Sequence, residues 1–364
     1  MPFESGSMTT TIFSLPEKLP EEYLELFHNA RAGKLDDVKD DPQIGWVSGR
    51  HLLETAINEE TAICGGHFYF NLRTAERKIP SALLKAICRR EELVYMKANE
   101  TFSVPSKVRR EIKETATEQN LMKMPPSISG IPAVIDLTDN TLYLGASSTK
   151  QVDEFIGLFY KTVNIEPIQM NVESILQLND LGAEHDLPNV MFSEKSDHET
   201  VPARDFLTWL WFYSEHEDGE LSHEQFGDFA IIIEAPLTLS FASEAQGAAE
   251  TVLKKGDRPL RSAEAKAALS VGKKLKKAKF TMARGEDIWS GTFDAENFCF
   301  SGLSVPEGEE MELHSRFAER ILNLSIFRLV IEEYFKKFVE TVKHPDFKDT
   351  EKQFAKWSTE RDSF

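Results

Sequence analysis

Basic residues are the ones in this sequence whose types and spacing suggest a chemistry. They are concentrated in residues 253–279. This stretch holds ten basic and two acidic residues, a net charge of +8, whereas the whole chain carries −18. Positive charge gathered in one place on an acidic protein attracts an anionic partner. The alternative is an ordinary solvated surface. The candidate contact residues of this stretch are Lys254, Lys255, Arg258, Arg261, Lys273, Lys274, Lys276, Lys277 and Lys279.

Two short basic clusters in this stretch bracket one short predicted helix. Ser262 is suited to cap it, residues 263–270 are rich in alanine, and Gly272 is suited to end it. From Lys276 to Met282 the side chains alternate with a period of two, which predicts a β-strand. We expect the leading end and the outer face of this strand to be basic.

A second region whose charge opposes that of the whole chain extends from Arg73 to Lys123, with twelve basic and seven acidic residues. Two helices are predicted in it, from Ser81 to about residue 96 and from Pro105 to about residue 119. Strands are predicted before and after these helices. The sequence therefore predicts a helical hairpin inserted into a sheet.

No catalytic constellation stands out in the sequence. It contains no glycine-rich nucleotide-binding loop, no HExxH motif and no GxSxG motif. Four histidines lie in the acidic region 179–234, but their spacing matches no metal-ligand pattern. Pro345-Asp346 with Glu351-Lys352 resembles a nuclease motif only faintly, because no strand is predicted there to aim the carboxylates. We predict no enzymatic activity, no cofactor and no metal site.

The acidic region also contains the most aromatic run of the chain, residues 206–213. Its apolar side chains fit one helical face, which is typical of buried core. Stacking of nucleic-acid bases on it is rejected, because a surrounding net charge of −12 would repel phosphates.

The composition is that of a soluble protein. No apolar run is long enough for a transmembrane helix, and the first sixteen residues lack the features of a secretory signal. Three cysteines without a CxxC pair are typical of reduced thiols in a cytoplasm. We therefore expect a cytoplasmic protein that contacts no membrane.

The predicted elements indicate an α+β fold with mixed sheets, and the length allows two domains. The expected segments are a loose tail (1–8), an α+β domain (9–178) with a helical excursion at about 80–124, a second α+β domain (179–308) containing the basic element 253–279, a C-terminal helix (309–344) and a polar tail (345–364).

The basic stretch matches what binding to a nucleic-acid backbone requires. Lysines and arginines that neutralise the phosphates of a duplex release counterions, which gives affinity without sequence information. No asparagine, glutamine or aromatic residue is interleaved with these lysines to read base edges. We hypothesise sequence-independent DNA binding. Two alternatives remain open, a protein-interaction scaffold that does not bind DNA and a nuclease of unrecognised type.

Several motifs, in their order and spacing, resemble the RdgC family of bacterial recombination-associated proteins. In chain order they are Gly45-Trp46-Val47, residues 72–81, Val134-Ile135-Asp136, Leu142-Tyr143-Leu144, residues 146–150, Lys254-Lys255 with the Ser-led helix after it, Gly272-Lys273 with the basic strand, and the helix around 317–338. The resemblance covers residues 9–343 in patches.

This resemblance implies a ring-shaped homodimer that binds duplex DNA without sequence preference through a positively lined central hole. It also implies restraint of a RecA-type recombinase, association with the nucleoid, and no catalytic residue. Lys254 and Lys255 would lie near the hole. Lys123 falls just before the loop that would meet the partner subunit. The further candidates for the inner surface are Arg73, Arg77 and Lys78.

The sequence departs from the family pattern in two places. Met124-Pro125-Pro126 stands in the loop where the family tends to have an aromatic residue, so we expect the dimer contact at that end to be rebuilt or weakened. The acidic segment 179–234 is also longer than the family pattern leads us to expect.

Overall fold

A computed structural model describes residues 2–195, 199–242, 248–256, 258–308, 312–361 and 363, and its described strands form one antiparallel sheet. From edge to edge the main path is β10 (Glu250–Leu253), β9 (Gly227–Ser240), β11 (Lys274–Arg284), β12 (Asp287–Asp294), β13 (Cys299–Ser304), β1 (Met8–Ser14), β6 (Thr141–Leu144), β5 (Ser127–Asp136), β4 (His67–Glu76) and β2 (Gln43–Ser48). Beside it β3 (Ile63–Cys64) pairs with β4, β7 (Ile168–Gln169) with β1, and β8 (Glu220–His223) with β9. The α+β class is confirmed, but one antiparallel sheet replaces the expected mixed sheets.

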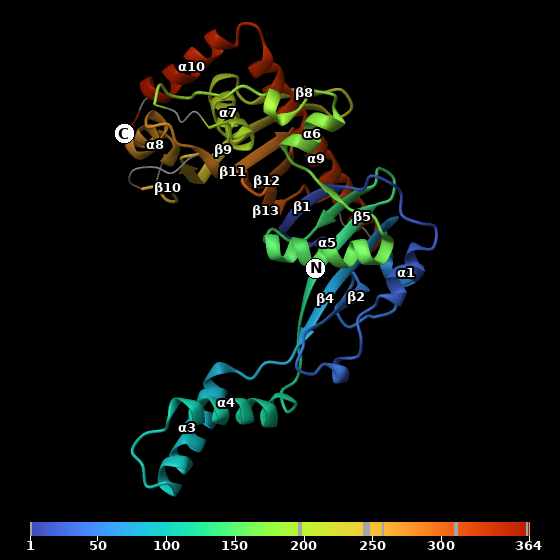
Figure 1. The fold of residues 1–364 in the computed structure, drawn as a ribbon. Coiled ribbons are helices and arrows are strands. Elements are labelled where there is room, and N and C mark those ends of the chain that lie inside the picture. Colours follow the sequence, from blue (N-terminus) through green and yellow to red (C-terminus); the bar gives the residue numbers. More distant parts are fainter. Residues whose placement is uncertain are drawn as a thin grey trace.

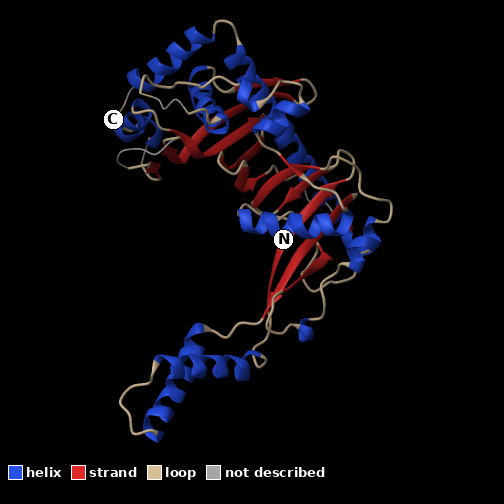
Figure 2. Ribbon diagram, in the orientation of Figure 1, coloured by secondary structure: helices blue, strands red, loops and turns tan. Residues whose placement is uncertain are grey.

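The first strand joins the two halves of this sheet. Strand β1 pairs with β13 on one side and with β6 on the other, so the N-terminal strand lies between strands from both halves of the chain. Figures 1 and 2 show the result, a long twisted sheet that forms the middle of an open arc. One end of the arc carries α8 and β10, and the other is a projecting pair of helices.

In the N-terminal half, helices cover both faces of the sheet. Strand β4 alternates between them, as the period of two requires: Phe70 packs against Trp46, whereas Tyr69 packs against Phe317 on the opposite side. The first face is covered by α1 (Tyr23–Asn29) and α5 (Thr149–Val163), and the second by α9 (Leu313–Lys343). The expected start of the last helix at Glu309 lies outside the described residues.

In the C-terminal half, described helices cover only one face. Helix α7 (Pro202–His216) carries the aromatic run, and residues 206–213 are all buried, which confirms their assignment to the core. Phe280 of β11 stacks on Phe327 of α9 at 5.6 Å between ring centroids. On the other face Ile232 and Ile288 are exposed, and Lys279 and Thr281 share that face with them.

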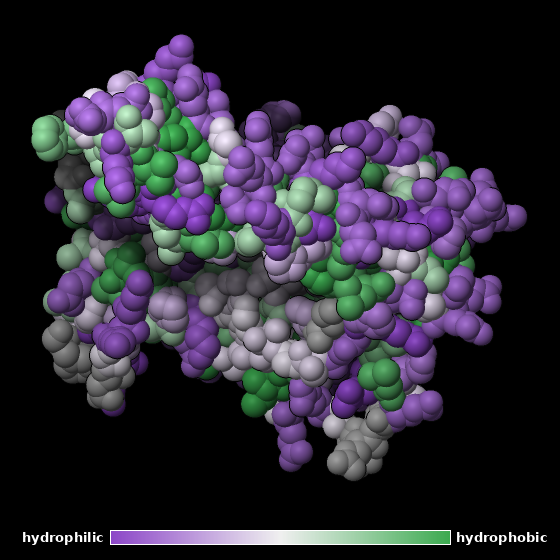
Figure 3. All heavy atoms as spheres, turned by 90° about the horizontal axis from the view of Figure 1, so that it is seen from below, coloured by the Kyte–Doolittle hydropathy of each residue, from purple (hydrophilic) through white to green (hydrophobic). Residues whose placement is uncertain are grey.

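A helical hairpin, α3 (Ser81–Ala98) and α4 (Ser106–Leu121), is inserted between β4 and β5, as the sequence predicts. It projects away from the sheet (Figure 1), and none of the residues of α3 is buried. Phe102, in the connection between the two helices, is fully exposed. Seen from below, the molecule presents mostly hydrophilic side chains with scattered hydrophobic ones (Figure 3).

The expectation of a loose N-terminal tail was wrong. Residues 2–7 are fixed, because Phe3 is buried and the Arg320 guanidinium donates to the backbone carbonyls of Pro2, Phe3 and Gly6. Within the polar tail, helix α10 (Phe347–Glu360) forms, and its Phe354 and Trp357 side chains are buried in the core.

The remaining helical elements are short. They are α2 (Glu59–Ala62), α6 (Val172–Leu178), α8 (Ala263–Ser270), and the 3₁₀ turns η1 (Leu35–Asp37), η2 (Glu184–Asp186) and η3 (Pro259–Arg261). None of the described helices combines the length and apolarity needed to span a bilayer.

Candidate nucleic-acid interface

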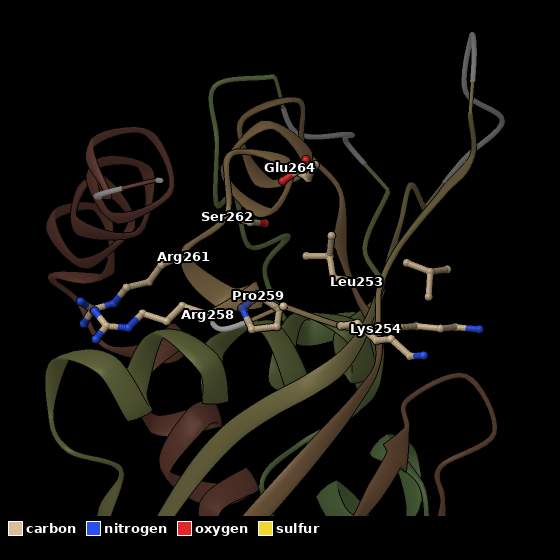
Figure 4. Close-up of a pocket in the computed structure, with 10 residues that line it drawn as sticks. Leu253, Lys254, Arg258, Pro259, Arg261, Ser262 and Glu264 are labelled. Carbon is tan, nitrogen blue, oxygen red and sulfur yellow. The ribbon is translucent and has the colours of Figure 1, made fainter.

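The first cluster of the basic stretch forms a cleft at one edge of the sheet. Strand β10 is the edge strand beside β9 in the described sheet, and the chain then turns through η3 into α8. The Ser262 hydroxyl accepts the Ala265 N–H at 3.1 Å, which caps α8 as the sequence predicts. The turn encloses a cleft of about 650 Å³ (Figure 4). A neighbouring cleft of about 740 Å³ extends it toward Glu234 and Lys279 on the open face of the sheet.

Four predicted contact residues line this cleft, and all four are exposed: Lys254, Lys255, Arg258 and Arg261. None of them forms an ion pair with any residue that the structure describes; Asp257 lies outside those residues. Figure 4 shows Arg258 and Arg261 reaching in one direction and Lys254 in the other. We call the surface formed by these four cations the basic cleft.

Three lysines of β11, Lys276, Lys277 and Lys279, are partly exposed, and each one pairs with at least one carboxylate. The N···O pairs are Lys276–Glu250 at 2.9 Å, Lys276–Glu296 at 3.3 Å, Lys277–Asp294 at 2.7 Å and Lys279–Glu234 at 2.9 Å. The hydrogen bond to Glu250 raises the pKa of Lys276, and the one from Lys279 lowers the pKa of Glu234. The carboxylate partners of these lysines cancel much of the field that an approaching phosphate would meet.

Two lysines of the second cluster are buried and cannot contact DNA in this structure. Lys274 forms an ion pair with Asp205, 2.5 Å between Nζ and Oδ1, and each side chain is 1% exposed. Lys273 donates to the Ala248 carbonyl at 2.8 Å and to the Thr251 hydroxyl at 2.7 Å, and its Nζ lies 5.1 Å from the centre of the Phe241 ring. Both were predicted to contact phosphates. Their contacts instead hold the start of β11 against neighbouring segments of the protein.

The candidates near the hairpin also divide into buried and exposed groups. Arg73 is buried, and its guanidinium donates to the carbonyls of Leu52 and Gly33, so it cannot line a hole. Lys78 is exposed and pairs with Glu76 at 2.5 Å.

The other two candidates lie at the root of the hairpin. Arg77 donates to the carbonyls of Val38 and Met124, and so ties the root to the body of the protein. Lys123 is exposed, with its Nζ 3.2 Å from the Asn120 Oδ1. Of the four candidates around the hairpin, only Lys78 and Lys123 present their charge to solvent.

The sequence interpretation missed a group of residues that supports the basic cleft from behind. The Arg361 guanidinium donates to the Leu260 carbonyl in η3 at 2.7 Å and to Glu215 at 3.0 Å. It also stacks on Trp211 at 4.5 Å and on Trp357 at 4.9 Å. No local pattern reveals this arrangement, because the residues come from three distant segments.

The candidate metal and nuclease residues do not form a site. The described residues contain no group of three or more His, Cys, Asp or Glu side chains that could hold a metal ion; His198 lies outside them. Glu351 and Lys352 stand on helix α10, where Glu351 accepts the Met191 N–H and Lys352 pairs with Asp349. The nuclease motif therefore has no strand to present it.

A comparison with known protein families gives a match to the first half of the chain. Residues 10–189 match the model of the family described as "RdgC: Putative exonuclease, RdgC". No curated protein is significantly similar to the chain. The matched part runs from β1 to η2 and includes the hairpin, whereas the basic cleft lies beyond it.

Proposed function

The chain belongs to the RdgC family of recombination-associated proteins, and on this premise we propose that it binds double-stranded DNA through the phosphate backbone as a homodimer. Binding is independent of base sequence and is not accompanied by catalysis. In the cell the protein would associate with the nucleoid, and by occupying duplex DNA it would restrain a RecA-type recombinase.

The observation that carries this proposal is the basic cleft. On a chain with a net charge of −18, four exposed cations gather within eight residues, 254–261, and no described carboxylate pairs with them. Unpaired cations on an otherwise acidic surface favour contact with a polyanion at one place and disfavour indiscriminate adsorption. Residues 254–261 include no Asn, Gln or aromatic side chain beside these cations, so the expected contacts are with phosphates.

The shape of the molecule supports a dimeric arrangement. The chain forms an open arc (Figure 1), with β10 and α8, which lie beside the basic cleft, at one end and the hairpin at the other. Phe102, Leu93 and Val94 expose apolar surface on the hairpin, which is typical of surfaces that pack against another molecule. In the proposed dimer, two arcs meet through their hairpins.

The test is duplex affinity across a salt series, measured on two unrelated sequences of equal length. Log K should fall by about 0.9 per log unit of salt for each phosphate contacted, equally on both sequences. Changing the four cations of the basic cleft to Gln should make that slope shallower. A matched control changes four exposed lysines that lie outside the cleft to Gln. They are Lys34, Lys39, Lys150 and Lys348. Equal slopes in the two variants would refute the role of the cleft.

A second candidate function is the exonuclease activity in the printed description of the matching family. Incubation of end-labelled duplex with the protein and Mg²⁺ or Mn²⁺ tests it directly. We expect no release of nucleotides. Release that depends on the metal ion and survives further purification would establish the exonuclease instead.

A further inference from the structure

Arg258 and Arg261 form a pair of like charges at one side of the basic cleft. Both side chains extend from the ends of η3 in the same direction, away from Lys254 (Figure 4), and both line the cleft of about 740 Å³. Neither has a carboxylate partner within the described part of the chain. Two neighbouring guanidinium groups repel each other, so an anion bound between them would relieve that repulsion.

The turn that carries the two arginines is held in place from behind. Leu260, the residue of η3 directly before Arg261, accepts a hydrogen bond from Arg361. Glu215 holds Arg361 in turn, and its two carboxylate oxygens also accept the indole N–H groups of Trp211 at 2.9 Å and Trp357 at 2.7 Å. A backbone fixed in this way presents its charged side chains with less loss of entropy on binding.

Arg361 is buried behind this end of the cleft and pairs with Glu215 at 3.0 Å. Burial lowers the pKa of its guanidinium, Glu215 raises it, and the charge of Arg261 lowers it. Its carboxylate partner, Glu215, already accepts two indole N–H groups. The described residues that line this cleft include the cations of Lys254, Arg258, Arg261 and Lys279 and the carboxylates of Glu215 and Glu234, and the excess of cations suits a ligand with two negative charges.

We propose that this end of the cleft binds a phosphomonoester, with Arg258 and Arg261 as its ligands and Arg361 as the residue that positions them. Planar guanidinium groups match the geometry of phosphate oxygens and bind them in a bidentate manner. The phosphomonoester is either the terminal phosphate of a nucleic-acid strand or that of a free nucleotide. The volume lies in the range of small-ligand sites, so the cleft can admit the phosphate at the end of a strand.

Recognition of a strand's terminal phosphate rests on the proposed DNA binding, whereas binding of a free nucleotide does not. The test uses fluorescence anisotropy with one short duplex that carries a 5′-phosphate, a 3′-phosphate or only hydroxyl ends. A closed circular duplex serves as a ligand without ends. The full chain should bind one phosphorylated form about tenfold more tightly than the hydroxyl form, the gain expected of one charge-assisted contact. A free mononucleotide tests the second source, as a competitor and, with its own label, as a direct ligand.

Two pairs of substitutions at exposed positions make the test specific. Arg258→Gln with Arg261→Gln should abolish the preference for a phosphorylated end, and Lys254→Gln with Lys255→Gln should keep it while weakening binding to every duplex. Arg361→Gln should reduce the preference, provided that its thermal unfolding stays cooperative.

The possible outcomes separate this proposal from the proposed function. Equal affinity for all three duplex ends, together with no binding of the mononucleotide, would overturn the phosphomonoester site even if the circular duplex binds well. Failure to bind the circular duplex, with a preserved preference for phosphate, would overturn backbone binding and leave the site in place. A mononucleotide that binds, with no difference between the duplex ends, would assign the cleft to free nucleotides.

Discussion

The Nζ of Lys274 lies 2.5 Å from Oδ1 of Asp205, and both side chains are almost completely removed from solvent. The pair joins strand β11 to helix α7, two elements that are far apart in the second half of the chain. Lys274 also donates to the Asn189 side-chain oxygen at 3.3 Å. A residue that a lysine-rich run places among DNA contacts thus belongs to the core.

Removing one member of this pair should destabilise the fold and leave DNA binding unaffected. Lys274→Met leaves an unpaired buried carboxylate, and we expect it to lower the free energy of unfolding by about 3 kcal/mol. Lys274→Met combined with Asp205→Leu should restore most of that stability, because two apolar side chains leave no buried charge. Urea denaturation measures the stability, and an unchanged salt dependence of DNA affinity serves as the control.

Asp205 should also make stability depend on pH. Burial raises the pKa of this carboxyl to about 6, although the charge of Lys274 acts in the opposite direction. The folded state therefore holds the proton up to a higher pH than the unfolded state, so this contribution is complete at low pH and is lost as the pH rises to about 6. Asp205→Asn should remove it. Urea unfolding at pH 4 and pH 6.5 should show a greater difference for the native chain than for the variant.

Ion-paired lysines of β11 should matter less for DNA binding than the basic cleft. Lys279→Gln combined with Glu234→Gln leaves the net charge unchanged, and we expect duplex affinity to change by less than about twofold. Lys254→Gln with Lys255→Gln should reduce the salt slope by up to about two units, because each phosphate that is no longer neutralised lowers the slope by about 0.9. A larger effect of the first pair than of the second would place the DNA on the open face of the sheet.

The C-terminal helix should contribute to stability through its buried aromatic face. Trp357→Ala removes a core side chain that packs against Trp211 and Phe212, and it should cost about 3 kcal/mol or more. Lys352→Ala, on the exposed side of the same helix, is the control and should change the free energy of unfolding by less than about 0.5 kcal/mol. Equal effects of the two changes would mean that α10 does not dock in solution.

The hairpin tip should affect association and not folding. Phe102 is fully exposed, so Phe102→Ser should leave the thermal stability of the monomer unchanged. If the hairpin contacts a second copy, the change should raise the dimer dissociation constant, measured by sedimentation velocity. Leu322→Ser, an exposed apolar position on α9, is the control. A dimer that tolerates Phe102→Ser but not Leu322→Ser would locate the contact on α9.

Much of the fold is predictable from local patterns. The period of two in β11, the helical face in α7 and the cap at Ser262 each specify an element within a few residues of its observed bounds. The inserted hairpin follows from its charged helices and the prolines around them. These features depend on neighbours in the chain, so a single sequence contains them.

The sequence also shows where positive charge is concentrated, but it does not show whether each lysine is exposed, ion-paired or buried. Between Leu275 and Lys277 the register of β11 against β9 shifts, which disturbs the alternation where the lysines are densest. Lys274 meets Asp205 from a distant earlier segment, and Lys276 meets carboxylates on both sides of it in the sequence. Arg361 meets η3 across a similarly long separation. The sequence by itself determined the secondary structure and where positive charge is concentrated. Only the tertiary structure decided which of those charges face solvent, because the partners that neutralise or bury a side chain come from distant parts of the chain.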